Sequence, residues 1–314
     1  MSNYNFSQIN DDSYPAIQEL YLRSFGIKAS VETIKEKYNT SAFGLKNIGF
    51  LAKDNDNDLA AYYGVFPLRM SIDGKDYLIA QSGDTMTAPE HQKKGLFTNL
   101  AKLTYKLAQE KGIQMVFGFP NKNSLPGFQK KLDWQFYGCM QNFTIFNNVI
   151  PLCEFSFKYK LFLSLYKKYC QSKLAKYKIS CSDFNMETFN EKSSKGYIKR
   201  DIDFFNYKLR DKNLYLIKIN DFILLIKPLP HLNIGAVGAF QSERTDDFIH
   251  TLKVLAKKLG CKRTIISVSE NHWLFKYLKD RVEHTESFPI GYFSINPDLP
   301  YSDISFIGAD YDTF

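Results

Sequence analysis

The sequence has 314 residues, of which 44% are hydrophobic and 24% are charged, as in a folded globular protein and unlike a disordered or fibrous one. At roughly 150 residues per domain, this length predicts two domains. Its apolar runs, such as 222–226, are far too short to cross a bilayer, and residues 1–12 lack the basic and apolar stretches of a signal peptide. The net charge of +8 favours an anionic ligand, which leaves phosphorylated small molecules, nucleic acid and membrane surfaces open.

The five cysteines are an odd number, lie far apart in the chain and include no C-x-x-C pair. This pattern argues against a disulfide framework and against a structural zinc site. It is typical of a protein from the reducing cytoplasm, and we expect no metal cofactor.

Apolar spacing and turn residues predict an α/β fold built on a mixed sheet. In the first 86 residues they predict a strand at 4–10, a helix that ends before Gly26, a helix at 30–38, and strands at 49–53, 59–66 and 77–86. The next helix carries an apolar stripe of Phe97, Leu100, Leu103 and Leu107 and ends at Gly112. A strand at 113–119, a helix at 124–132 and a strand at 135–146 follow.

Residues 151–180 are predicted to form a basic helical connector between the two halves. This segment contains seven lysines between many Leu, Phe and Tyr residues, and Glu154 is its one acidic residue. Three interpretations stay open for it: a solvated lysine face, a helix that lies on a membrane surface, or a contribution to binding a phosphorylated ligand.

The second half repeats features of the first. Laying Gly260 on Gly112 also lays Asn271 on Asn123, with a helix before each glycine, a strand after it and then a further helix. Helix–glycine–strand patterns also align by chance, but a duplicated fold is the better interpretation. The predicted domains are therefore 1–150 and 181–314, joined by 151–180.

The most informative stretch is 83–97, which reads as the end of a strand, a tight loop and the start of a helix. The free N–H groups from Gln92 to Phe97 point outward at that start, and together with the helix dipole they form a cradle for an anion. Gly95 permits close approach of a phosphate, and Lys93 and Lys94 add positive charge at the rim. A diphosphate fits this arrangement.

Here the sequence resembles the GNAT acyltransferase superfamily. The cofactor motif of that family, Gln/Arg-x-x-Gly-x-Gly/Ala, reads Gln92-Lys93-Lys94-Gly95-Leu96-Phe97, in which Phe97 replaces the usual small residue. The segment 123–134 is similar to the family's Asn…Phe-Tyr-x-Lys-Leu-Gly-Phe segment. The resemblance covers residues 1–146 and implies a GNAT fold there, followed by a second, degenerate GNAT-like half.

The resemblance implies an acyl-CoA cosubstrate. Its pyrophosphate would lie on the amides of Gln92, Lys93, Lys94, Gly95, Leu96 and Phe97, its pantetheine would pair with the backbone of Met86 and Thr87, and Asn123 would help to hold it. An amine attacks the thioester directly, so the enzyme supplies a base and stabilises the oxyanion.

Asp84 is the leading candidate for the base, and a capping or buried hydrogen-bonded aspartate is the alternative interpretation. His91 is expected to point to solvent. Gln129 stands where many members of the family have a tyrosine that acts as the acid. Tyr137 is close to Gln129 in the sequence, and nothing beyond this proximity favours it as the acid.

The second half lacks the motif, because Phe240, Glu243 and Thr245 fall on Gln92, Gly95 and Phe97 under the same shift. The carboxylates at that helix start would repel a diphosphate, so we expect a single cofactor site, in the first half. The second half would then help to form the acceptor pocket, for which the candidate lining residues are Tyr197, Phe204, Phe205, Tyr207, His231 and Tyr292.

The predicted function is transfer of an acyl group from acyl-CoA to a primary amine. The segment 302–310 resembles the end of two-lobed bacterial enzymes of surface-polysaccharide biosynthesis, which suggests a nucleotide-linked amino sugar as the acceptor. Two alternatives stay open: a Fem-like transferase that uses aminoacyl-tRNA, with the lysines of 158–178 on the RNA backbone, and a non-catalytic acyl-CoA sensor. A nucleic-acid partner is disfavoured because the loop 92–95 suits CoA.

Overall fold

The computed structural model describes residues 4–190 and 194–314 and divides into two compact units. Unit 1 comprises residues 1–137 and 289–301, and unit 2 comprises 138–288 and 302–314. Residues 1–3 of the predicted first domain and 191–193 of the predicted second domain lie outside the described residues. The predicted boundaries at 150 and 180 stay a prediction. The units of the structure instead divide within two long strands, β6 (Gln135–Phe146) and β12 (His284–Ser294).

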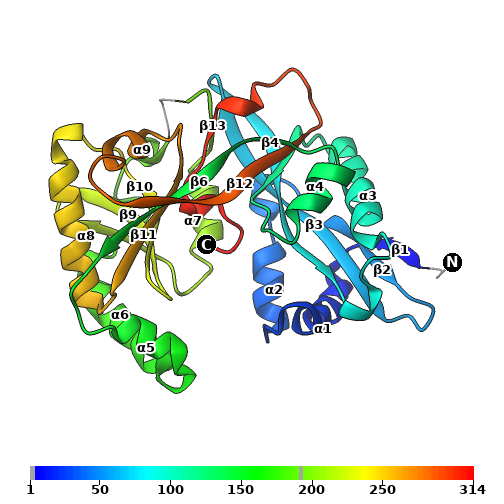
Figure 1. Ribbon diagram of the computed structural model, residues 1–314, viewed down its shortest axis with the longest axis horizontal. Helices are drawn as coiled ribbons and strands as arrows, with labels where there is room; N and C mark the ends of the chain where they lie inside the picture. The colour runs from blue at the N-terminus through cyan, green and yellow to red at the C-terminus, as the bar shows by residue number, and fades with distance from the viewer. Residues whose placement is uncertain (1–3, 191–193) are drawn as a thin grey trace. The chain divides into compact units, whose positions relative to one another are not determined.

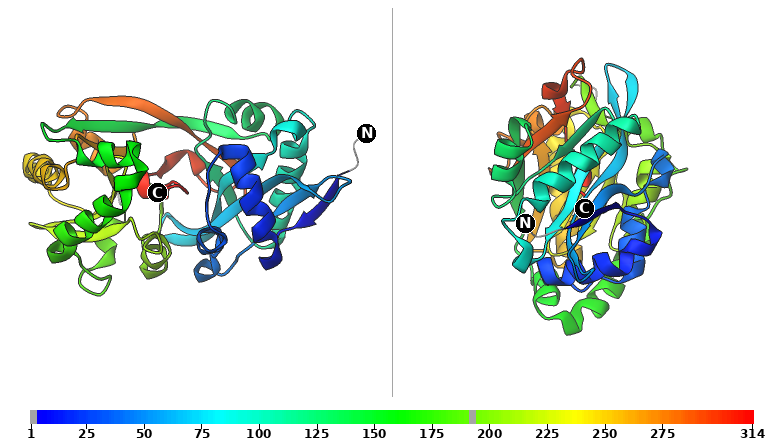
Figure 2. Two further views of the ribbon diagram at one scale, coloured as in Figure 1. Left: turned by 90° about the horizontal axis from the view of Figure 1, so that it is seen from below. Right: turned by 90° about the vertical axis from the view of Figure 1, so that its right-hand side faces the viewer.

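Unit 1 is a mixed sheet with helices on both faces (Figures 1 and 2). The strands lie in the order β1-β2-β3-β4-β5-β12. The strands wholly within this unit are β1 (Asn5–Gln8), β2 (Ile48–Lys53), β3 (Leu59–Ile72), β4 (Lys75–Thr87) and β5 (Met115–Gly118), and its helices are α1 (Tyr14–Phe25), α2 (Val31–Tyr38), α3 (Leu96–Glu110) and α4 (Leu125–Lys131).

The predicted elements of the first half are confirmed, with shifted ends. Asp73 and Gly74, both with positive φ, form a two-residue turn between β3 and β4. Gly26 (φ +67°) ends α1 in the left-handed conformation, and the Ser30 hydroxyl caps α2 by accepting a hydrogen bond from the Thr33 N–H. The strand predicted at 113–119 is shorter, because its pairing covers Met115–Gly118.

Two apolar clusters fix the helices of unit 1 on opposite faces of its sheet. Leu96, Leu100 and Tyr105 of α3 pack with Tyr63 of β3, whereas Ile17 of α1 belongs to the other cluster, which also holds Tyr38 and Tyr62. Alternate residues of β3 therefore face different helices. Side chains of β4 therefore face either α3 or the pair α1 and α2, depending on the side of the sheet from which they project.

In unit 2 the strands lie in the order β6-β11-β10-β9-β8. Its elements are α5 (Leu152–Lys158), α6 (Leu163–Leu174), β7 (Gly196–Ile198), α7 (Ile202–Lys208), β8 (Tyr215–Ile219), β9 (Phe222–Pro228), β10 (Leu232–Val237), α8 (Thr245–Leu259), β11 (Arg263–Ser269), α9 (Trp273–Leu278) and β13 (Ile304–Ser305). The single predicted connector helix is in fact two helices, since the chain leaves helical geometry at Tyr159 (φ −107°, ψ 87°). Neither Pro nor Gly marks that break in the sequence.

The two halves of the sequence exchange their last strands. β6 follows α4 in the chain but pairs antiparallel with β11, from Arg263 opposite Phe146 to Ser269 opposite Met140. β12 follows α9 but pairs antiparallel with β5, from Gly291 opposite Gly118 to Ser294 opposite Met115. Each unit is therefore completed by a strand from the other half of the sequence. In the described part of the chain, no helix is long and apolar enough to cross a membrane.

Candidate functional site

The strand β4 has a free edge beyond its short pairing with β5. Among the described residues, these parallel strands pair only at Ala80 with Val116 and at Gln81 with Phe117, and β5 ends one residue later. The segment 82–87 of β4 continues past this point and remains paired to β3 on its other side. An open strand edge offers backbone N–H and C=O groups to an extended, amide-containing ligand.

A β-bulge in this free segment reorients Asp84. Tyr62 pairs with Met86 and Gly64 with Gly83, so Asp84 and Thr85 together face the single residue Tyr63. Asp84 has a left-handed backbone conformation, with φ of +51°. An aspartate tolerates this conformation better than most residues, and the bulge turns its side chain toward α1 and α2.

The Asp84 carboxylate is buried and paired. Its Oδ1 accepts hydrogen bonds from the Tyr21 hydroxyl at 2.6 Å and from the Lys37 ammonium at 2.7 Å, and its side chain is 5% exposed. Its Oδ2 is buried with no hydrogen-bond partner among the described residues. Burial, and secondarily the Asp84 charge, raises the pKa of the Tyr38 and Tyr62 phenols.

These contacts agree with the alternative interpretation from the sequence, in which Asp84 is a buried aspartate held by hydrogen bonds. The role of Asp84 as a base stays a prediction, and Oδ2 is the atom with capacity for it. Tyr21 and Lys37 were missed by the sequence analysis, because neither lies in a recognisable motif and both reach Asp84 through the fold.

The loop before α3 has the shape predicted for an anion cradle, except that the Gln92 N–H, which was predicted to be free, donates to the Pro89 carbonyl at 3.4 Å. Lys93 (φ +62°) and Gly95 (φ +79°) adopt left-handed conformations, and Gly95 is the N-cap of α3. Within the described part of the chain, the backbone N–H groups of 93–98 make no hydrogen bond. Residues 92–95 are exposed, and a Cβ at Gly95 would meet nothing within 4 Å. The loop thus offers unpaired donors and open space to an anion.

The remaining predicted cofactor residues differ in accessibility. The Met86 side chain is buried in the cluster under α1 and α2, so only its backbone is available, and Thr87 is half-buried. Asn123 is exposed in the turn before α4, where its N–H donates to the Asn121 side chain. No hydrogen bond joins Asn123 to loop 92–97 among the residues that the structure describes.

The prediction that His91 points to solvent is wrong. Its Nδ1 lies 2.9 Å from the Tyr4 hydroxyl, its Nε2 lies 3.5 Å from Asp54 Oδ2, and its side chain is 13% exposed. Both partners are distant in the sequence, which is why local spacing did not reveal them. His91 ties the loop to β1 and to the turn between β2 and β3.

Phe97, the departure from the family motif, has a packing role. Its ring packs edge-on against Phe128 and Tyr63, with ring centroids 5.1 Å and 5.8 Å apart. A Cβ at Gly127 would lie 2.8 Å from the Phe97 ring, so a large residue at 97 requires glycine at 127. The glycine within α4 is thereby explained.

A buried chain of hydroxyl groups ends at Ser82, the first residue of β4 beyond the pairing with β5. The Trp134 Nε1–H donates to the Tyr105 hydroxyl at 2.8 Å. The Tyr105 and Tyr63 hydroxyls lie 2.8 Å apart, and the Tyr63 hydroxyl lies 2.8 Å from Ser82 Oγ. Burial raises the pKa of both tyrosines, so both remain protonated donors.

The donor and acceptor of each hydrogen bond in this series of hydroxyl groups follow from counting the available protons. Trp134 can only donate, so the Tyr105 oxygen accepts from it. Were Tyr105 to accept from Tyr63 as well, its own buried proton would lack an acceptor among the described residues, which costs about 1–3 kcal/mol. The favoured order is Trp134 to Tyr105 to Tyr63 to Ser82, which leaves the Ser82 proton to be donated elsewhere.

The two residues considered for acid catalysis lie in different surroundings. Gln129, in the position of the family's tyrosine, is exposed on α4. Tyr137 is half-buried with its ring centroid 5.9 Å from that of Tyr292. The Tyr292 hydroxyl donates to Gln135 Oε1 at 2.6 Å.

In unit 2, the position corresponding to the open strand edge is filled by the C-terminal segment. β10 and β11 pair in parallel from Leu232 to Ile234, and Ile307 then bridges to Val268 of β11. The Phe314 ring occupies the space that a side chain at Gly235 would need. The start of α8 is acidic as predicted, with Asp246 and Asp247 in its first turn.

A buried ion pair holds this C-terminal segment in place. Arg200 Nη2 donates to both oxygens of Asp310, at 2.7 Å and 3.0 Å, and both side chains are essentially inaccessible to solvent. Asp310 Oδ2 also accepts from the Ile307 N–H at 2.8 Å. These contacts give the segment 302–310 a structural role in unit 2.

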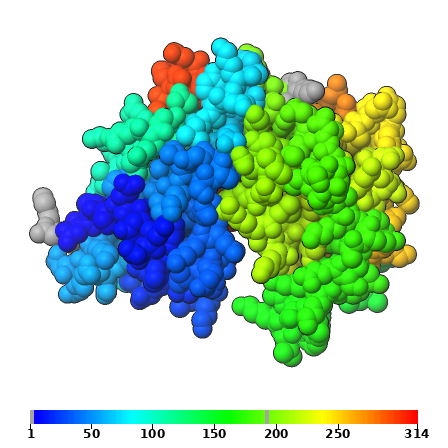
Figure 3. Space-filling model, turned by 180° about the vertical axis from the view of Figure 1, so that it is seen from behind, coloured from blue at the N-terminus to red at the C-terminus, as the bar shows by residue number. Residues whose placement is uncertain are grey.

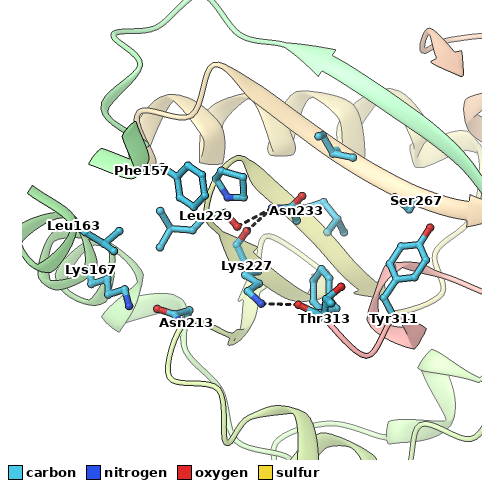
Figure 4. Close-up of a pocket in the computed structure, with 15 residues that line it drawn as sticks. Phe157, Leu163, Lys167, Asn213, Lys227, Leu229, Asn233, Ser267, Tyr311 and Thr313 are labelled. Atoms are coloured by element: carbon cyan, nitrogen blue, oxygen red, sulfur yellow. Dashed lines mark hydrogen bonds between the residues drawn. The ribbon is translucent and has the colours of Figure 1, made fainter. Parts of the chain in front are cut away.

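Unit 2 contains a cavity of about 460 Å³ (Figure 4). One end is formed by Phe157, Leu163 and Lys167, and Lys227 donates to the Thr313 carbonyl at its floor. Among the residues that the structure describes, its lining includes none of the six predicted acceptor-pocket residues. Of those six, Phe204 and Phe205 are fully buried core residues of α7.

Comparison with known proteins identifies the domain that carries the loop. Residues 5–137 match the family described as Acetyltransferase (GNAT) domain. The matched region includes β4 and the start of α3, and it supports a transferase activity for the chain. A comparison with curated proteins gave no match.

Solved structures resemble almost the whole chain. A GCN5-related N-acetyltransferase from Kribbella flavida is 12% identical and covers 94% of this chain and 72% of its own, with a TM-score of 0.58. One from Sphaerobacter thermophilus is 14% identical over 96% of this chain and 98% of its own, with a TM-score of 0.54. The glucosamine N-acetyltransferase region of a fungal multi-domain GH3 β-N-acetylglucosaminidase is 13% identical over 93% of this chain and 38% of its own, with a TM-score of 0.51. These similarities show a shared two-lobed fold.

Proposed function

We propose that this protein transfers an acyl group from acyl-CoA to the primary amine of a nucleotide-linked amino sugar in the cytoplasm. The observation that carries the proposal is the free edge of β4 next to the unpaired amides before α3, within a domain that matches the acetyltransferase family. The first feature suits an extended amide chain and the second suits a diphosphate.

The residues of the loop fit the diphosphate of CoA. The backbone N–H groups of Lys93, Lys94, Gly95, Leu96 and Phe97 would hold the two phosphoryl groups, and Gly95 leaves room for their approach. The Lys93 and Lys94 side chains are exposed at the rim and add attraction that salt weakens. Met86 and Thr87 would bind the pantetheine through backbone groups, and Asn123 would lie at the far rim.

Asp84 is proposed to accept the proton that the attacking ammonium must lose. Its Oδ1 is occupied by Tyr21 and Lys37, so the proton would pass to Oδ2, directly or through a water molecule. The N–C bond then forms as the C–S bond breaks. The nitrogen then loses its second proton to solvent, and the leaving thiolate takes up a proton from solvent.

Ser82 is proposed to donate a hydrogen bond to the charge that develops on the thioester. Its hydroxyl lies on the α3 face of the sheet, whereas the Asp84 carboxylate lies on the α1 and α2 face. The Ser82 hydroxyl, a hydrogen-bond donor, and the Asp84 carboxylate, a proton acceptor, thus lie on opposite faces of the free segment of β4. Gln129 is exposed on α4 in the place of the family's acidic tyrosine, so protonation of the thiolate is left to solvent.

Two observations support an amino sugar as the acceptor. The charge of +8 suits a reaction with two diphosphate-bearing substrates, and one structural neighbour is a glucosamine N-acetyltransferase region. The aminoacyl-tRNA alternative is not favoured, because the matching family is an acetyltransferase domain.

The test is turnover of acetyl-CoA with a panel of amines that includes nucleotide-linked amino sugars, followed by release of the free thiol. Thiol release that depends on a nucleotide amino sugar supports the proposal. Release with other amines alone removes the sugar acceptor, and CoA binding without turnover supports a sensor. Binding of tRNA that weakens steeply with salt would favour the aminoacyl-tRNA alternative.

A further inference from the structure

The helical segment after β6 exposes an unusual concentration of large apolar side chains. We call the surface of residues 150–168 the α5–α6 tip. Leu161 is 84% exposed, Ile150 77% and Leu165 63%. The other exposed apolar residues of the tip are Leu152, Phe155, Phe157, Tyr159 and Phe162. A folded protein seldom leaves so many neighbouring apolar groups in water unless they contact something else.

The tip is anchored from behind. Tyr166, Cys170 and Leu174 form the buried stripe of α6 and belong to the core of unit 2. The Tyr166 hydroxyl donates to the Leu259 carbonyl of α8 at 3.0 Å, and the Tyr169 hydroxyl donates to the Lys258 carbonyl at 2.7 Å. The exposed side chains therefore form the outer face of an element whose inner face is already packed. Figure 3 shows this green segment projecting from the surface.

Lysines surround the apolar tip. Lys158, Lys160, Lys167 and Lys168 lie within it, and Lys173, Lys176 and Lys178 follow along the same segment. No carboxylate lies within ion-pair distance of these lysines in the part of the chain that the structure describes. Glu154, the one acid of 151–180, is occupied by the Lys262 N–H at 3.1 Å and by His231 at 3.4 Å. The positive charge of the tip is thus uncompensated.

We propose that the α5–α6 tip docks this protein on the surface of an anionic lipid bilayer. Its apolar side chains would enter the boundary between headgroups and acyl chains, and its lysines would extend to the lipid phosphates. The solvated lysine face that the sequence also allowed does not explain why the Leu161 side chain is so exposed. A second copy of the chain is disfavoured as the occupant, because a two-fold interface would bring the same uncompensated lysines together.

Vesicle sedimentation with the full-length protein tests this proposal. The probes are vesicles of phosphatidylcholine alone and of phosphatidylcholine with about one third phosphatidylglycerol, at low and high salt. We expect binding to the anionic vesicles that weakens at high salt, and little binding to the neutral ones. The assay contains no acyl-CoA, so its result is independent of the proposed reaction.

Two pairs of exposed residues separate the apolar contribution from the electrostatic one. Leu161→Ser with Leu165→Ser should weaken binding by about tenfold or more for each leucine. Lys160→Gln with Lys168→Gln should weaken it by about fivefold for each charge and reduce its salt dependence. These side chains are exposed, so the variants should unfold at the wild-type temperature.

The matched control is Lys253→Gln with Val254→Ser, which removes one exposed lysine and one exposed apolar residue from α8 and should bind as wild type does. The proposal is overturned if wild type does not bind anionic vesicles, or if the leucine variant binds as well as the control. It is also overturned if wild type dimerises and the leucine substitutions abolish the dimer, because the tip is then a protein interface.

Discussion

Substitution of Gly95 tests whether the loop before α3 binds a diphosphate. Gly95 and Gly112 flank the same helix with nearly equal backbone angles, φ of +79° and +78°, and a Cβ at either would meet nothing within 4 Å. Gly95→Ala and Gly112→Ala should therefore destabilise the fold equally, by about 1–2 kcal/mol each for the left-handed conformation. The pair separates backbone strain from effects on ligand binding.

Glutamate at the same two positions should have different effects on CoA binding. At position 95 the new carboxylate would stand within the cradle. One charge about 6 Å from a phosphoryl group costs about 3 kcal/mol at an effective dielectric constant of about 20, which is about 100-fold in Kd. At position 112, beyond the far end of α3, the same charge should change the Kd by less than about threefold.

Isothermal titration with CoA measures these affinities, and thermal unfolding of the same samples measures the strain. The reasoning fails if Gly95→Glu binds CoA as tightly as wild type. It also fails if Gly112→Glu loses as much affinity, because the loss would then come from unfolding and not from the cradle.

Three further substitutions test other parts of the molecule. Asp84→Asn should leave the Kd for CoA unchanged and lower kcat by about 100-fold or more, and unchanged turnover at every pH would remove Asp84 as the base. Ser82→Ala should lower kcat by about 100-fold with little change in CoA affinity, and a kcat equal to wild type would show that Ser82 does not act on the thioester. Burial, and secondarily the Arg200 charge, lowers the pKa of His272 well below its usual 6.5, so stability should fall as the pH drops below about 6.5, by up to about 1.4 kcal/mol per pH unit. His272→Asn keeps a capping side chain and should flatten this slope in urea unfolding, while the exposed His250→Asn should keep it, and equal slopes in both variants would contradict the assignment.

The elements of the first half were predictable because each depends on local signals. The stripe of α3 repeats at helical spacing, and Gly112 ends it, so neither requires knowledge of the fold. The loop 92–97 was found in the same way, from a short motif between a strand and a helix. The features that are predictable from the sequence are therefore those that local patterns within about 15 residues determine.

The surroundings of the site were not predictable, because they join residues that are far apart in the chain. Lys37 lies 47 residues from Asp84, and Trp134 lies 29 residues from Tyr105. The same limit explains the error at His91, whose partner Tyr4 is 87 residues away. Polar side chains on neighbouring strands and helices have no periodic signature in the sequence, so only the fold reveals that they meet.

The exchange of β6 and β12 shows why duplication alone did not predict the units. A duplicated sequence suggests that each half folds on its own strands. Pairing with β11 and β5 makes the strand order of each unit depend on both halves of the chain. In unit 2 the C-terminal residues around Ile307 and Phe314 fill the space beside β10. The carboxylates at the start of α8 and this filled strand edge are independent reasons why the proposed reaction belongs to unit 1.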